Sequence, residues 1–374
     1  MLSILFYYII CNSITFHDTE KLTQIMVNKE MNEAITEVFI NNISVIGAKA
    51  FYGCSNLENV SFQEPLILTI IEDSAFEECK GLKSILIPSS VQTIGMKTFY
   101  YCSNLENVSF QEQSNLTTIG NSAFEGCKEL KSILIPSSVQ EIWICAFQNC
   151  SNLENVSFQE QSSLTRIGNS VFDGCKELKS ILIPSSIQTI GMKTFYYCSN
   201  LENVSFQEQS NLTTIKESSF SNCNKLEIIE LPSQLKEISS RSFEGCNKLK
   251  SIIILSNISY IREYAFLNCL NLECILYYGT NNPEKVHDNI FSGCEEFSFI
   301  ITCLTYSSET FGSFKVRKTS ELPLTCLSKS NRLKSGEIAS IIICSFIFIV
   351  IICVVLFFTV FRKKKDKTQD ENTP

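Results

Sequence analysis

"IGNSAFEGCKELKSILIP" occupies residues 119–136, and variants of it follow one another along most of the chain. Each variant has a phenylalanine three residues before a cysteine, an apolar residue (nearly always leucine) three residues after it, and then two apolar residues separated by one position. We call these cysteines the rung cysteines: Cys54, Cys79, Cys102, Cys127, Cys150, Cys175, Cys198, Cys223, Cys246, Cys269 and Cys294. Most of their spacings alternate between 25 and 23 residues. One structural unit is therefore repeated.

The end of each unit predicts a short β-strand, because its apolar residues alternate with polar ones at a period of two. A unit of about 24 residues cannot bury its own apolar side chains, and stacking on a neighbour solves this. We therefore expect a parallel β-solenoid, a right-handed coil or horseshoe of about 11 rungs, where a rung is one turn of the coil. Glycines such as Gly95 and Gly120 are expected at corners that need positive φ.

The array grew by copying. Residues 95–119 and 191–215 are identical, 96 residues apart, which indicates duplication of two-rung blocks. Residues 34–40, "AITEVFI", fit one further strand in a degenerate N-terminal cap.

The pattern is similar to that of the leucine-rich-repeat superfamily, and it resembles most closely the BspA-like class of surface proteins. The resemblance extends from about residue 35 to 302 and depends on the I-x-x-x-x-F-x-x-C-x-x-L-x-x-I-x-I-P pattern seen in residues 119–136. It implies a cell-surface protein that adheres to host matrix proteins, other cells or mucosal material. It also implies that the ligand is a protein or glycan on host or neighbouring cells.

The two ends of the chain predict a membrane protein. Residues 338–361 carry no charge and are long enough to cross a bilayer as a transmembrane helix, and "RKKKDK" follows them. We therefore expect a single-pass plasma-membrane protein with an extracellular N-terminus. The expected divisions are a possible signal peptide (1–13), an N-terminal cap (14–45), the solenoid (46–302), a Ser/Thr-rich stalk (303–337), the transmembrane helix (338–361) and a cytoplasmic tail (362–374).

Two rows of side chains are expected to point outward from the stacked strands. One is a ladder of glutamates and lysines that alternate from rung to rung. The other alternates leucine and serine, and exposed leucines often mark a binding site. The predicted ligand surface comprises Leu86, Leu134, Leu182, Glu106, Lys131, Glu154 and Lys179. The alternative is that the charges serve register and solubility and that the leucines are merely tolerated.

The sequence also contains candidate modification sites. N-glycosylation sequons occur at Asn42, Asn59, Asn107, Asn115, Asn149, Asn155, Asn203, Asn211 and Asn257. The rung cysteines recur beside phenylalanine, so we expect them mostly to be buried thiols. Disulfide candidates are the off-pattern cysteines Cys145, Cys274, Cys303 and Cys326, with their pairing left open.

Several classes of function are disfavoured. The net charge of −8 argues against nucleic acid. No motif for a cofactor, a metal or a small-molecule substrate is present, and His287 lies on a degenerate rung, so we do not expect an enzyme. Three hypotheses remain: an adhesive surface protein, a passive coat or antigen without a specific ligand, and a receptor that acts through a co-receptor.

Overall fold

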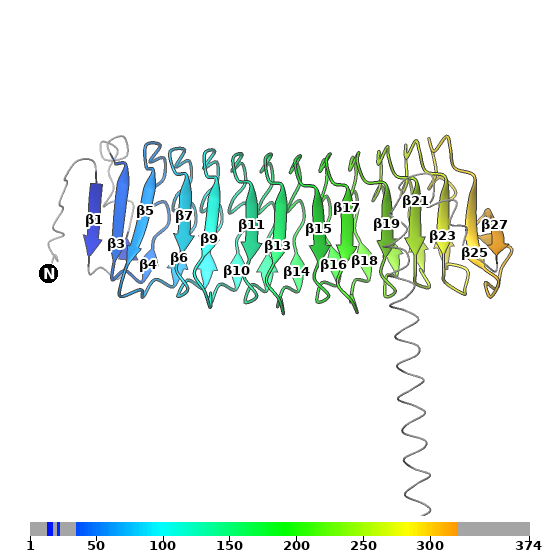
Figure 1. The fold of residues 1–374 in the computed structure, drawn as a ribbon, viewed down its shortest axis with the longest axis horizontal. Coiled ribbons are helices and arrows are strands. Elements are labelled where there is room, and N and C mark those ends of the chain that lie inside the picture. Colours follow the sequence, from blue (N-terminus) through cyan, green and yellow to red (C-terminus); the bar gives the residue numbers. More distant parts are fainter. Residues whose placement is uncertain (1–12, 18–20, 23–34, 320–374) are drawn as a thin grey trace, which may run out of the picture. The chain divides into compact units, whose positions relative to one another are not determined.

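A computed structural model describes residues 13–17, 21–22 and 35–319. The chain forms a parallel β-solenoid of about twelve turns, in which each turn contributes one longer strand and one two-residue strand (Figure 1). We call the longer ones the front strands and the others the back strands. In Figure 1 the front strands follow one another in a row from β1 to β25. The solenoid predicted from the repeat is confirmed.

The front strands are β1 (Ser13–His17), β3 (Glu37–Asn41), β5 (Asn59–Gln63), β7 (Ser84–Ile87), β9 (Asn107–Phe110), β11 (Ser132–Ile135), β13 (Asn155–Phe158), β15 (Ser180–Ile183), β17 (Asn203–Phe206), β19 (Ile228–Leu231), β21 (Ser251–Ile254), β23 (Cys274–Tyr277), β25 (Phe299–Cys303) and β27 (Phe314–Thr319). The back strands are β2 (Lys21–Leu22), β4 (Val45–Ile46), β6 (Ile70–Ile71), β8 (Thr93–Ile94), β10 (Thr118–Ile119), β12 (Glu141–Ile142), β14 (Arg166–Ile167), β16 (Thr189–Ile190), β18 (Thr214–Ile215), β20 (Glu237–Ile238), β22 (Tyr260–Ile261) and β24 (Lys285–Val286). A short strand, β26 (Thr310–Phe311), pairs antiparallel with β27.

The core is a column of phenylalanines, one per rung. From Phe51 to Phe291, successive rings stack with centroids 5.0–5.7 Å apart. Beside each ring, the rung thiol donates a hydrogen bond to the phenylalanine carbonyl of the preceding rung, as Cys102 does to Phe76 at 3.1 Å. Cysteine thus fills a small apolar site and satisfies a buried acceptor. The rung cysteines from Cys79 to Cys294 are thiols, as predicted.

Most of the 25-residue turns pair their front strands less completely than the 23-residue turns do, although the 25-residue turn from β23 to β25 pairs four residues. Every 23-residue turn, measured between rung cysteines, pairs four residues, as between β7 and β9. The 25-residue turns from β9 to β11 and from β13 to β15 retain one pair each. No ladder joins β5 to β7 or β17 to β19, so the front sheet is interrupted at both places. The back sheet runs unbroken from β2 to β24.

Two sequence-based expectations need correction. Gly95 and Gly120 do not have positive φ; they lie against each other, and a Cβ on Gly120 would come within 2.6 Å of the Gly95 backbone. Close approach, rather than a left-handed turn, requires glycine there. Most of the positive-φ positions are instead the residues five and one before the rung cysteine, such as Lys97 and Tyr101.

The second correction concerns the end of the solenoid, expected at residue 302. The sheet continues to Thr319, because β27 adds in parallel to β25. The predicted stalk of 303–337 therefore does not begin at residue 303. Within the described part of the chain, no helix is long and apolar enough to span a bilayer. The predicted segment 338–361 lies outside the described residues, as do residues 1–12 and Cys326.

Candidate binding face

We define the front face as the outward side of the front strands. Strands β7, β11 and β15 share the sequence SILI, whose first and third side chains point outward while the isoleucines enter the core. Leu86, Leu134 and Leu182 therefore stand on this face, with 47%, 49% and 47% of their surfaces exposed. Leucine is usually buried, so three half-exposed copies at one repeated position need an explanation.

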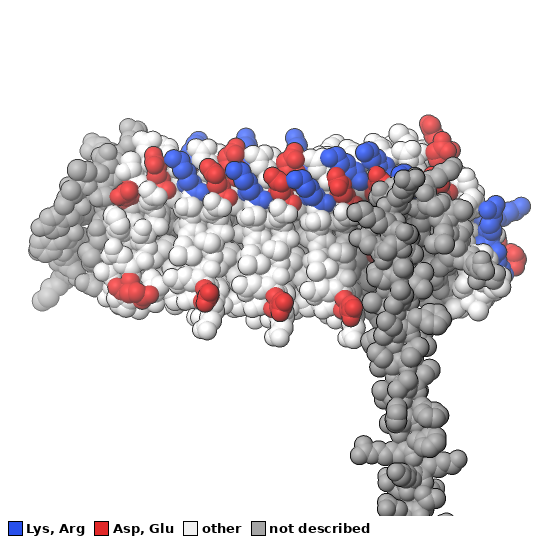
Figure 2. All heavy atoms as spheres, viewed as in Figure 1, with Lys and Arg blue, Asp and Glu red and all other residues white. Residues whose placement is uncertain are grey.

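Serines separate these leucines. In the strand registers, Leu86 is opposite Ser109, and Leu134 is opposite Ser157. Because neighbouring strands lie ~4.8 Å apart, successive leucines are about 10 Å apart. Figure 2 looks onto this side of the molecule, where the charges gather in two rows and leave an uncharged band between them. The leucines belong to the strands that form this band.

One row of charges is the predicted ladder of alternating sign. Lys179 Nζ lies 2.6 Å from Glu154 Oε2, and the Lys131–Glu106 and Lys83–Glu58 pairs are separated by 3.6 and 3.9 Å. The hydrogen bond from Lys179 lowers the pKa of Glu154 below its ordinary value, and the same bond raises the pKa of Lys179. Each of these three pairs joins a glutamate to the lysine of the next rung. The ladder therefore carries little net charge.

The other row in Figure 2 is acidic. Exposed glutamates follow four of the front strands: Glu64, Glu112, Glu160 and Glu208. An acidic row beside a compensated ladder offers no basic surface for a polyanion.

The candidate glycosylation sites lie at the surface. Eight of the nine sequon asparagines are exposed and Asn42 is half-buried. Asn107, Asn155 and Asn203 each begin a front strand and point outward. Asn107 pairs in register with Ser84, two residues from Leu86. A glycan on Asn107 would thus stand diagonally beside a leucine of the predicted ligand surface, at roughly 7–8 Å.

The disulfide candidates occupy different places. Cys145 lies half-buried in a turn, where its thiol is unbonded to another cysteine and burial raises its pKa to about 11. Cys274 and Cys303 are outward positions of β23 and β25, and Cys303 contacts the hydroxyl of Thr305 at 2.9 Å. Disulfide pairing stays a prediction.

A second apolar row, which was not predicted from the sequence, lies six residues before the rung cysteines. Met96, Ile144 and Met192 are exposed there, two rungs apart. On the intervening rungs, the same position is an asparagine whose side chain hydrogen-bonds to the backbone of the next rung. Asn121 Oδ1, for example, accepts a hydrogen bond from the Ile144 amide at 3.1 Å. Tyr101 and Tyr197 are also exposed, each in an edge-on pair with the preceding tyrosine. The 48-residue period was the signal that could have revealed this row.

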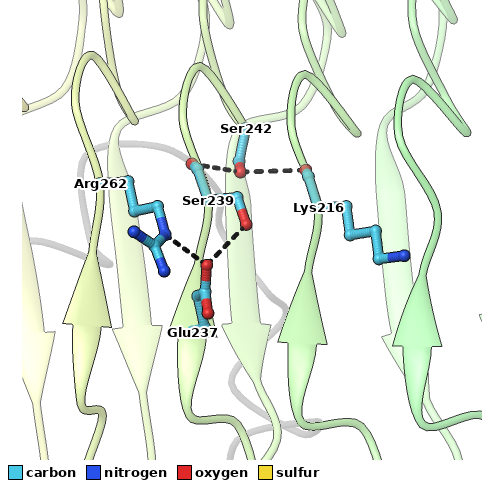
Figure 3. A network of polar contacts seen from close by, with 5 residues as sticks. All are labelled: Lys216, Glu237, Ser239, Ser242 and Arg262. Carbon is cyan, nitrogen blue, oxygen red and sulfur yellow. Dashed lines mark hydrogen bonds and ion pairs between the residues drawn. The ribbon is translucent and has the colours of Figure 1, made fainter.

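The polar side chains of the back sheet connect rungs. Figure 3 shows one such network, in which Glu237 accepts hydrogen bonds from Arg262 and from Ser239. Ser242 Oγ donates to the carbonyl of Lys216, on the preceding rung, at 3.2 Å. The bond from Arg262 holds the pKa of Glu237 below its ordinary value. These hydrogen bonds link neighbouring rungs, which is typical of a structural role.

His287 has a similar local partner. Its Nδ1 lies 3.3 Å from Glu263 Oε1, on the preceding rung. Among the described residues, no group of three or more side chains is placed to hold a metal ion.

Known proteins share this architecture. Three overlapping stretches, residues 23–154, 117–227 and 165–298, match a family model described as BspA type Leucine rich repeat region, in six copies. No curated protein matches the chain significantly.

Among solved structures, the pneumococcal vaccine antigen PcpA is 22% identical, with 79% of this chain and 77% of that chain covered and a TM-score of 0.49. A leucine rich cell surface protein from Faecalibacterium prausnitzii is 24% identical, with 78% and 90% covered and a TM-score of 0.43. A leucine-rich repeat protein from Bacteroides ovatus is 25% identical, with 74% and 94% covered and a TM-score of 0.40.

Proposed function

The chain belongs to the BspA-type leucine-rich-repeat family, and on that premise we propose that its front face binds a macromolecule, with adhesion to host matrix or host cells as the biological role. A protein with a leucine-rich-repeat solenoid typically binds other proteins along one exposed sheet.

The observation that carries the proposal is the row formed by Leu86, Leu134 and Leu182. The three side chains are identical and half-exposed, and they recur every 48 residues at the same position of β7, β11 and β15. Serine fills the same row on the intervening strands, so the fold itself does not need leucine there. Covering apolar surface contributes about 25 cal/mol per Å². Aliphatic side chains without aromatic rings among them favour a protein partner over a sugar.

The test uses cells that display the full chain, placed on surfaces coated with individual host matrix proteins. The combined change Leu86→Ser, Leu134→Ser and Leu182→Ser should lower attachment by roughly 10- to 100-fold, from ~1.5–3 kcal/mol of lost apolar contact. The matched control replaces Met96, Ile144 and Met192 by serine, and should leave attachment unchanged. Equal attachment by both triple variants would exclude the leucine row as the binding face.

A passive coat is the second candidate, and the sequons favour it. Asn107, Asn155 and Asn203 stand on the same face as the leucines, and glycans there would cover it. In that case the unaltered chain should attach to none of the coated surfaces, and the change of all three asparagines to glutamine should not create attachment. If the front face binds a protein, the glycan-free variant should attach as well as the unaltered chain or better. A receptor acting through a co-receptor would bind without attaching cells.

We further propose that the chain is anchored in the plasma membrane by residues 338–361, with the solenoid outside. The support is the uncharged stretch and the basic residues after it. Protease added to intact cells should remove an epitope in the solenoid and spare one in residues 362–374. Protection of both epitopes would place the chain on an internal membrane.

A further inference from the structure

The front face of β7–β17 repeats in steps of two rungs, and three rows of side chains change together from one rung to the next. Strands β9, β13 and β17, which carry serine in the row that alternates leucine and serine, follow a glutamate of the ladder and precede a glutamate of the acidic row. Strands β7, β11 and β15, which carry leucine, follow a lysine of the ladder and precede a proline. We call the first set the serine rungs and the second set the leucine rungs.

These two kinds of rung are complementary. A leucine rung placed against a serine rung sets leucine against serine, lysine against glutamate, and an uncharged strand end against a carboxylate. Two like rungs would instead set leucine against leucine and glutamate against glutamate, and like charges in contact disfavour association. Since the two kinds alternate, the face is complementary to a reversed copy of itself.

We propose that two copies of the chain pair front face to front face with their solenoid axes antiparallel, each leucine rung lying against a serine rung of the second copy. A twofold axis that runs parallel to the strands and passes between two neighbouring rungs has this result, because it exchanges rungs of opposite kind. With the axis between β11 and β13, Leu134 lies against Ser157 of the second copy, and Leu86 lies against Ser205 of the second copy. An axis between β9 and β11 exchanges the strands β5–β15 in the same way.

The leucines of one copy fit the gaps between those of the other. Neighbouring strands lie ~4.8 Å apart, so successive leucines are about 10 Å apart, with a small serine side chain between them. In the antiparallel pair, the leucines of the second copy stand over these serines. Leu86, Leu134 and Leu182 are each about half-exposed, so pairing removes apolar surface of the leucines of both copies from water.

The charge ladder favours the same arrangement. Within one copy, Lys131 lies 3.6 Å from Glu106, and Lys179 lies 2.6 Å from Glu154. In the pair, Lys131 faces Glu154 of the second copy, so that each lysine has glutamates on both sides of the interface. Parallel solenoids would instead set the ladder against the acidic row, with Glu106 facing Glu112 of the second copy. Repulsion between these carboxylates disfavours the parallel arrangement.

The paired face is small. Six strands at ~4.8 Å and about five residues at ~3.3 Å give roughly 500 Å² per copy and ~1,000 Å² in total, the lower limit of a specific interface. Association is therefore weak and depends on the local density of the chain. Pairing covers the leucine row, so a dense population closes this face to other ligands and a sparse population leaves it open. That consequence rests on the proposed function, whereas the pairing itself does not.

The first test maps the pairing in the purified full-length chain in detergent, at up to roughly 100 µM because a contact of this size is weak. Leu86→Cys and Leu182→Cys are made in separate copies, mixed, and treated with a short bismaleimide reagent. In the pair, position 86 lies ~5 Å along the solenoid from position 182 of the second copy, but ~14 or ~24 Å from position 86 of the second copy. The mixture should therefore yield at least ~5-fold more cross-linked dimer than either variant alone, measured as joined peptides by mass spectrometry.

The second test changes the charges. Leu134→Cys lies next to the twofold axis in both registers and should cross-link to itself, so it reports the effect. The acidic variant adds Lys83→Glu, Lys131→Glu and Lys179→Glu. The basic variant adds Glu106→Lys, Glu154→Lys and Glu202→Lys. Each variant alone should cross-link at least ~10-fold less, because like charges then face each other, and a mixture of the two should restore cross-linking.

A matched control changes three exposed residues outside the front strands. Met96→Ser, Ile144→Ser and Met192→Ser should leave the cross-linking of Leu134→Cys unchanged. The buried thiol of Cys223 must stay unreactive in every variant, which shows that the solenoid is intact.

Three results would overturn the pairing. They are an absence of cross-linking, cross-linking of Leu86→Cys to itself as fast as in the mixture, and no restoration when the acidic and basic variants are mixed. Host attachment is a separate measurement. Host attachment without this cross-linking pattern overturns only the pairing, and the cross-linking pattern without host attachment overturns only the proposed function.

Discussion

The strands β7–β17 and the strands β19–β27 share one core and differ on their outward side. In the first region, polar and apolar residues alternate along the front face, and leucines are half-exposed. In the second, Ile253, Leu276 and Ile301 stand in continuous register, and the latter two are fully buried. The inward residues therefore specify the coil, while the outward residues are free to diverge into an open surface or a covered one.

The two regions also differ in how completely neighbouring front strands pair. From β7 to β17, neighbouring strands joined by four residue pairs alternate with neighbouring strands joined by only one residue pair. From β19 to β25 every step pairs four residues. The first region is a series of duplicated two-strand blocks, and the second is one continuous ladder. The first region has kept a uniform surface through duplication, since residues 95–119 and 191–215 are identical, whereas the strands of the second region have diverged in sequence.

The largest expected effect tests whether the core really is common to both regions. Phe172 and Phe243 are both fully buried and stacked between neighbouring rings. Each change to alanine should destabilise the solenoid by about 3–5 kcal/mol, because it leaves a cavity in the phenylalanine column. Hydrogen exchange under mild denaturant reports the loss rung by rung. Losses that differ by several kcal/mol between the two sites would show that the regions do not share one core.

A smaller effect is expected where the regions differ. Leu276→Asp places a charge at a buried outward position and should cost ~2–4 kcal/mol. Leu134→Asp, at the open equivalent position, should change stability by less than ~0.5 kcal/mol. Urea denaturation followed by circular dichroism compares the two variants directly. Equal effects would mean that the two outward surfaces are not different environments.

Most of the fold could be predicted from the sequence, because the most regular pattern in the sequence comes from the residues that point into the core. Phenylalanine, cysteine and leucine recur at fixed offsets, and such recurrence predicts a core directly. The terminal rungs were underestimated for the same reason: β25 and β27 lack a following phenylalanine and cysteine pair, so the expected boundary at residue 302 came too early. Likewise, Gly95 was expected to serve a turn, because sequence does not show that another backbone lies against it.

The outward residues were only partly predictable. The charge ladder and the exposure of Leu134 followed from alternation along the strand, which reports the side on which a residue points. Alternation does not report what lies over that side. Leu276 and Leu134 have equivalent strand positions, and only the folded chain distinguishes the covered one from the exposed one.

The smallest expected effect compares an ion pair from each region. Glu237 and Arg262 are tied into a network with Ser239, whereas Glu154 and Lys179 are a more exposed pair. In both glutamates a hydrogen bond from the cation lowers the folded-state pKa. A carboxyl group whose pKa is lower in the folded chain than in the unfolded chain stabilises the fold. Its contribution is complete at pH values above the unfolded-state pKa of ~4.3 and is lost as the pH falls through the folded-state pKa.

Glu237→Gln should therefore lower the melting temperature at pH 7 more than Glu154→Gln does, since exposed pairs are weak and salt-screened. Melting curves from pH 7 to pH 3 at low and high salt provide the measurement. For each variant, the difference from the unaltered chain should shrink as the pH falls below about 4.3, and high salt should reduce it more for Glu154→Gln. A difference that persists undiminished in acid would mean that the carboxylate charge is not what stabilises the rungs. The side-chain packing of Glu237 would then be responsible.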